Sequence, residues 1–159
     1  LLLELAPGNY TAILRGVNNT TGVGLIEVYD LDPAGESKLA NISTRGFVQT
    51  GDNVLIGGLI LNGNGNQSIL VRAIGGSLPV AGALNDPTLE LFNGNGVSLA
   101  FNDDWRDSQE AAINATTIPP TDAREAALIA SLAPGNYTAI VRGFHNATGI
   151  ALVEVYTLP

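Results

Sequence analysis

The sequence predicts an all-β protein, an antiparallel two-sheet β-sandwich of jelly-roll type with nine to eleven short strands. Three observations carry this prediction. Stretches in which apolar and polar residues alternate recur along the chain. Gly and Asn, which accept turn conformations easily, bound these stretches at intervals of about 8–12 residues. Apolar residues make up 45% of the chain and charged residues 14%, which is typical of a folded domain and not of a disordered acidic segment.

The expected strands follow one another along the chain. Strands 10–17 and 22–29 flank a polar NNTTG turn and are predicted to form a hairpin. A copy of this hairpin is predicted near the C-terminus, from strands 136–143 and 149–156. Asn-Gly-Asn-Gly at 93–96 predicts a further hairpin, and the run 62–66 predicts one more, because Asn and Gly adopt positive φ at little cost. Residues 107–115 have helical composition and are expected to form one or two turns. The predicted strands are 10–17, 22–29, 39–48, 53–61, 67–74, 88–92, 97–101, 127–132, 136–143 and 149–156.

The two ends of the chain are copies of one segment. Leu5–Asp32 and Leu132–Pro159 align without a gap at an offset of 127 residues and are identical at 19 of 28 positions. Self-similarity at a fixed spacing is typical of arrays of repeated units. We therefore expect residues 1–32 to be a terminal β-hairpin duplicated from a preceding unit. Residues 33–159 are expected to be one complete sandwich repeat.

Several segments resemble a repeat of about 125 residues that is common in long secreted bacterial proteins. The resemblance lies in DPTLELFNGNGVSLAFNDDWRDSQEAAI at 86–113, EAALIASLAPGNYTAIVRG at 125–143, GIALVEVYTL at 149–158 and ILVRAIG at 69–75. The order of these motifs is more distantly similar to that of pre-peptidase C-terminal domains. The resemblance implies a β-sandwich, export from the cell and tandem arrangement, and it implies an accessory role without catalysis.

The charge of the chain excludes one large class of partner. Its formal net charge is -8, and its seven Lys and Arg residues are scattered, whereas nucleic-acid binding needs basic clusters. The chain has no cysteine, so no disulfide holds the fold. Apolar runs are too short to span a bilayer, which predicts no membrane span.

Asn-x-Ser/Thr sequons are more frequent than chance. There are eight of them, where composition alone predicts about two, and they are the acceptor motif for N-glycosylation. The alternative is that Asn and Thr are simply the favoured turn and strand residues. Either interpretation favours an extracellular or cell-surface location. The glycosylation candidates are Asn9, Asn19, Asn41, Asn66, Asn114, Asn136 and Asn146.

An acidic loop follows the predicted strand at 97–101. Asp103, Asp104 and Asp107 offer the carboxylate oxygens that calcium prefers, with Asn102 or a backbone carbonyl to complete the shell. The alternative is a loop whose aspartates cap the short helix, with Arg106 forming an internal ion pair. Calcium is the single cofactor that the sequence suggests, and 30–36 is a weaker version of such a loop.

No residue pattern indicates an enzyme. The chain lacks a nucleophile elbow, paired metal-binding histidines and a phosphate loop. Its single His145 lies in a predicted turn, and its single Trp105 is either a loop anchor or a platform for a surface glycan. We expect no catalytic activity.

The duplicated hairpin is the main functional prediction from the sequence. One sandwich needs one such hairpin, so residues 1–29 would present an apolar face without a partner. Three outcomes are open: complementation of another copy of this chain, membership of an adjacent unit in a covalent tandem array, or folding within this domain. The first two describe a structural filament or stalk, and the alternative function is a carbohydrate- or surface-binding accessory module. The predicted contact residues are Tyr10, Ile13, Leu14, Leu25, Ile26, Val28 and Tyr29.

Overall fold

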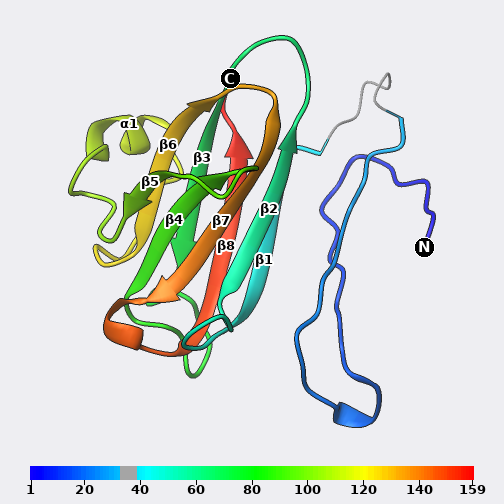
Figure 1. Ribbon diagram of the computed structural model, residues 1–159, viewed down its shortest axis with the longest axis vertical. Helices are drawn as coiled ribbons and strands as arrows, with labels where there is room; N and C mark the ends of the chain where they lie inside the picture. The colour runs from blue at the N-terminus through cyan, green and yellow to red at the C-terminus, as the bar shows by residue number, and fades with distance from the viewer. Residues whose placement is uncertain (33–38) are drawn as a thin grey trace. The chain divides into compact units, whose positions relative to one another are not determined.

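The computed structural model describes residues 1–32 and 39–159 and divides the chain into two units, Leu1–Leu39 and Ala40–Pro159. The second unit holds eight strands and one short α-helix (Figure 1). In the described residues, no helix has the length and apolar character needed to cross a membrane. The elements are β1 (Asn41–Val48), β2 (Leu55–Leu61), β3 (Gln67–Ile74), β4 (Pro87–Asn93), β5 (Ser98–Asn102), α1 (Glu110–Ala115), β6 (Ala126–Leu132), β7 (Gly135–Gly143) and β8 (Gly149–Thr157).

The strands form two four-stranded antiparallel sheets. The first sheet has the order β1-β8-β3-β6 and the second the order β2-β7-β4-β5. β1 pairs with β8, β2 with β7, β3 with β6 and β4 with β5. This is the jelly-roll topology, so the predicted fold class is confirmed. The hairpin predicted at 93–96 is confirmed, because β4 and β5 pair across it.

Two predicted hairpins are wrong. β2 and β3 lie in different sheets, so the loop 62–66 crosses from one sheet to the other. β7 and β8 also lie in different sheets, and the connection between them is an arch. Gly and Asn permit sharp turns of either kind, whereas pairing is decided by distant strands. Here β7 pairs with β2 and β4, and β8 pairs with β1 and β3.

The strands predicted at 10–17 and 22–29 are not formed within the described residues, which lowers the count below the nine to eleven predicted. A β-strand is defined by its ladder of hydrogen bonds to a neighbour. Residues 1–32 have no such ladder, and all of them are exposed. Both sheets consist of strands between Asn41 and Thr157, so the outcome in which this segment folds into the same sandwich is not what the structure shows.

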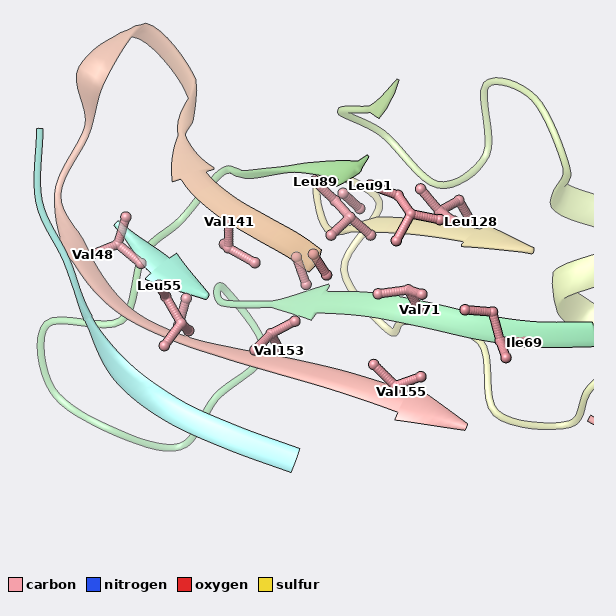
Figure 2. Packing of buried hydrophobic residues seen from close by; sticks show 14 of the residues in the cluster. Val48, Leu55, Ile69, Val71, Leu89, Leu91, Leu128, Val141, Val153 and Val155 are labelled. Carbon is pink, nitrogen blue, oxygen red and sulfur yellow. The ribbon is translucent and has the colours of Figure 1, made fainter. Parts of the chain in front are cut away.

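The hydrophobic core lies between the two sheets. Figure 2 shows that side chains such as Val71 and Val153 from the first sheet meet Leu91 and Val141 from the second. Alternation along each strand explains this, because every second residue faces the interior. In β8, Val153 and Val155 are buried in this core, and Glu154 between them points to the outer face.

A second, smaller cluster covers the outer face of the first sheet. Leu70, Trp105, Ile113 and Ala127 are buried together, and Ile113 is supplied by α1 beside β6 (Figure 1). Gln109 fixes this segment to β6, because its side-chain amide accepts from the backbone N–H of Ile129 at 2.8 Å and donates to the carbonyl of Ile129 at 3.0 Å. The helix predicted at 107–115 is confirmed at Glu110–Ala115.

Candidate interaction site

The N-terminal copy, residues 5–32, and the C-terminal copy, residues 132–159, share the backbone conformation of one turn. In the C-terminal copy the arch passes through the 3-10 turn Phe144–Asn146, with positive φ at His145 (51°) and Asn146 (62°). In the N-terminal copy the turn is Val17–Asn19, with positive φ at Asn18 (53°) and Asn19 (58°). The local sequence is therefore sufficient to give the arch its turn, even where no sheet surrounds it.

A glycine beside the turn and a tyrosine near the start of the segment make the same local contacts in both copies. A Cβ at Gly143 would clash with the backbone of Ala147, and one at Gly16 would clash with the backbone of Thr20. The hydroxyl of Tyr137 donates to the carbonyl of Ala133 at 2.8 Å. The hydroxyl of Tyr10 makes the same bond to the carbonyl of Ala6 at 2.7 Å. The two copies thus share the turn and this local hydrogen bond, although strands are formed in the C-terminal copy alone among the described residues.

The copies differ in burial. Val141, Val153 and Val155 of the C-terminal copy are 0%, 2% and 6% exposed. Their counterparts at the offset of 127 residues are Leu14, Ile26 and Val28, which are 55%, 44% and 57% exposed. All seven predicted contact residues are exposed in the described structure: Tyr10, Ile13, Leu14, Leu25, Ile26, Val28 and Tyr29.

The acidic loop does not gather its carboxylates around one point. In the described residues, no three His, Cys, Asp or Glu side chains lie close enough together to hold a metal ion. Asp107 is exposed, and its backbone N–H donates to the carbonyl of Asp104 at 3.0 Å. The N-cap residue of α1 is Gln109, and no side chain caps the helix, so the interpretation that the aspartates cap it is wrong. The Nε atom of Arg106 lies 3.7 Å from a carboxylate oxygen of Glu110. Calcium binding by Asp103, Asp104 and Asp107 stays a prediction.

Burial does affect two aspartates near this loop. It is the main cause that raises the pKa of Asp86 and of Asp103, and neighbouring carboxylates raise both further. One carboxylate oxygen of each is buried without a hydrogen-bond partner among the described residues. Of the weaker candidate loop 30–36, residues 33–36 lie outside the described residues, and Asp30 accepts from the backbone N–H of Asp32 at 2.9 Å.

Trp105 is an anchor and not a binding platform. It is 2% exposed, and its indole N–H donates to the carbonyl of Asp122 at 3.1 Å. The guanidinium of Arg106 lies 4.9 Å from its ring centroid. The interpretation of Trp105 as an exposed sugar platform is therefore wrong.

Sequence reasoning missed three charged residues that the fold largely covers. Glu125 is fully buried, and its carboxylate accepts from the backbone N–H groups of Gly75 and Ser77 at 2.9 and 3.0 Å and from the hydroxyl of Ser77 at 2.6 Å. Arg72 and Glu154 form an ion pair on the outer face of the first sheet. The available signal for Arg72 and Glu154 was a charged residue inside each of the apolar strands ILVRAIG and LVEVY, and no such signal marked Glu125.

All seven glycosylation candidates are exposed, which is the accessibility that glycan attachment needs. Three of them lie in strands or the helix: Asn41 in β1, Asn136 in β7 and Asn114 in α1. Glycosylation itself stays a prediction.

The fold and the duplicated segment define a jelly-roll sandwich module with one surplus copy of the segment that contains β7 and β8. No protein-family model matches the chain, and no curated protein matches it. Among solved structures, it is similar to the pre-peptidase C-terminal domain of a collagenase from Bacillus anthracis. Identity is 13% over 73% of this chain and 89% of that chain, with a TM-score of 0.47. No residue role is transferred from this likeness.

Proposed function

We propose that this protein is an extracellular structural subunit, a repeat unit of a filament or stalk in which strands of one unit complete the sandwich of the next. The observation that carries the proposal is the difference in burial between the two copies. The N-terminal copy has the turn of the C-terminal copy and exposes apolar side chains whose counterparts are buried in the C-terminal copy. Exposed apolar surface of this kind favours association with a complementary body.

The topology indicates where such a segment fits. β7 and β8 lie in the interior of their sheets, and each has a partner strand on both sides. A copy of them therefore fits between the strands of a body equivalent to β1–β6, not along the edge of a finished sheet. Each chain has two copies of the β7–β8 segment but only one set of strands β1–β6. The C-terminal copy already pairs with that set. This count favours a covalent tandem array, with one pair for each body, over complementation between separate copies, which requires exchange.

Electron microscopy with size-exclusion light scattering tests the proposal. The intact chain is compared with a chain that lacks residues 1–32 and with a full-length control in which Leu14, Ile26 and Val28 are changed to Ser. Filaments that vanish in both variants support exchange between copies. A monomer in all three excludes exchange between separate copies and leaves the covalent array and the binding module. Filaments that persist in both variants contradict any role of the N-terminal copy in assembly.

One observation favours the alternative, a binding module for carbohydrate or a surface partner. A groove of about 480 Å³ lies on the second sheet and is lined by polar and apolar side chains that include Phe92, Asn136 and Ile140. A ring beside amide groups suits a sugar. Glycan-array binding that is lost in Phe92→Ala supports this function. The absence of binding for the intact chain counts against it.

A further inference from the structure

On the outer face of the first sheet, Arg72 of β3 is hydrogen-bonded to Glu154 and Tyr156 of β8. We call these three residues the trio. The guanidinium of Arg72 donates to the carboxylate of Glu154, and it donates to the hydroxyl of Tyr156 at 3.2 Å and to the carbonyl of Ile118 at 2.6 Å. The hydroxyl of Tyr156 donates to Glu154 at 2.9 Å. The side chains of Arg72 and Glu154 are only 14% and 9% exposed, so water screens the pair little. Ser43 of β1 completes the row with a bond to Glu154 at 3.2 Å.

The N-terminal copy contains the glutamate and the tyrosine of this trio but not the arginine. Glu27 and Tyr29 stand where Glu154 and Tyr156 stand in the C-terminal copy. The hydroxyl of Tyr29 donates to Glu27 at 3.0 Å, as the hydroxyl of Tyr156 does to Glu154. None of the ion pairs among the described residues involves Glu27.

We propose that the body that receives the N-terminal copy recognises it through an arginine at the position of Arg72, which pairs with Glu27 and Tyr29. This inference rests on the proposed function and names the residue that selects the incoming strand. The partner is a second β-sandwich body of the same repeat, with this arginine on its β3 and an apolar cover beside it.

The trio also fixes the register of the incoming strand. A slip by one residue turns the Glu side chain into the core, and a slip by two places Leu25 or Tyr29 beside the arginine in place of Glu27. Both slips leave a nearly buried guanidinium without its carboxylate, which is strongly unfavourable. Lysine cannot replace the arginine equally, because the planar guanidinium serves the carboxylate, the hydroxyl and a carbonyl together. The arginine therefore selects against wrong strands as well as for the right one.

The first test uses the chain itself. Arg72→Met and Glu154→Gln are each expected to lower the midpoint of thermal unfolding by roughly 10 °C, because each leaves a buried charge without its partner. The double variant is expected to lose clearly less than the sum of the two. The control cycle is Arg142→Met with Glu90→Gln, a pair 3.7 Å apart whose side chains are 45% and 29% exposed, and only small and additive shifts are expected from it. Additive losses for Arg72 and Glu154 overturn the proposal.

The second test builds the receiving body. Residues 33–127 of one copy are joined directly to residue 1 of an intact chain, which keeps the offset of 127 residues. Calorimetry of this two-unit chain is expected to give about twice the unfolding enthalpy of the single chain, since enthalpy scales with the number of folded residues. If only one unit folds, the proposed function fails and the inference fails with it.

The same two-unit chain tests recognition by the arginine independently of the proposed function. Glu27→Gln, and Arg72→Met in the added body alone, are each expected to lower the unfolding midpoint of the first unit by the amount seen in the single chain. Their effects are expected to be non-additive. A folded first unit that is indifferent to both changes keeps the proposed function and refutes recognition by the arginine.

Discussion

Val141 and Leu14 occupy equivalent positions in the two copies and provide a matched pair for mutagenesis. Val141 on β7 is 0% exposed between the sheets, whereas Leu14 is 55% exposed. Truncation of Val141 to Ala removes two methyl groups, which costs about 1.6 kcal/mol in transfer free energy at about 0.8 kcal/mol each. The cavity left in the core raises the expected loss to roughly 2–3 kcal/mol. Leu14→Ala removes more apolar volume but is expected to cost less than about 0.5 kcal/mol, because no core surrounds it.

The assay is urea unfolding of the full chain, followed by the fluorescence of Trp105, the single tryptophan, which is buried in the sandwich unit. Val141→Ala is expected to lower the midpoint at an unchanged slope, and Leu14→Ala is expected to leave both unchanged. Equal losses from the two variants would refute the reasoning, since they would show that the N-terminal copy is packed in a core. If Val141→Ala caused no loss of stability, the reasoning would also be refuted, because Val141 would then not contribute to the core.

Three further predictions concern single sites. Glu125→Gln is expected to lower the unfolding free energy by about 2–3 kcal/mol in urea titrations, because an amide group would face the N–H donors that the carboxylate now accepts from. Trp105→Phe is expected to cost about 1 kcal/mol through the lost bond to Asp122, and native Trp105 should resist acrylamide quenching. Burial raises the pKa of Asp86 and Asp103 above 3.8, so their contribution to stability is full below pH 3.8 and is lost as pH rises through the folded-state values. Asp86→Asn combined with Asp103→Asn should therefore gain stability relative to the wild type as pH rises from 3.5 to 7, and a pH-independent difference in urea midpoints would contradict this.

Strand positions were predictable because they depend on local alternation. β3 has the predicted bounds at 67–74, and β6, β7 and β8 differ from prediction by one residue at an end. The sheet to which each strand belongs was not predictable in the same way. Nothing in the turn Phe144–Asn146 distinguishes a hairpin from an arch, because positive φ at His145 and Asn146 suits both. The partners of β7 and β8 are decided by β1 to β4, far away in sequence.

The candidate site shows the same division. The apolar residues of the N-terminal copy could be identified from the duplication alone, because each aligns with an apolar or aromatic residue of the C-terminal copy. Their exposure could not be predicted in this way, because burial depends on the strands that surround the segment. Arg72 and Glu154 could not be paired from sequence, because the pairing depends on the register of β3 against β8. Trp105 was ambiguous for a similar reason. Its burial depends on the cover that 103–125 forms over the first sheet, which no periodicity indicates.

The position of β7 and β8 in the chain has a consequence for the order of folding. β1 pairs with β8 and β2 pairs with β7, so neither of the first two strands has a partner in its sheet until the last two arrive. Before that point only β3 with β6 and β4 with β5 can pair, and isolated two-stranded pieces are marginal in water. A chain that emerges from its amino end must therefore hold most of a unit unfolded and then close it in one late step. In a tandem array this delay would recur every 127 residues, and each unit would become stable only when its own final strands had appeared.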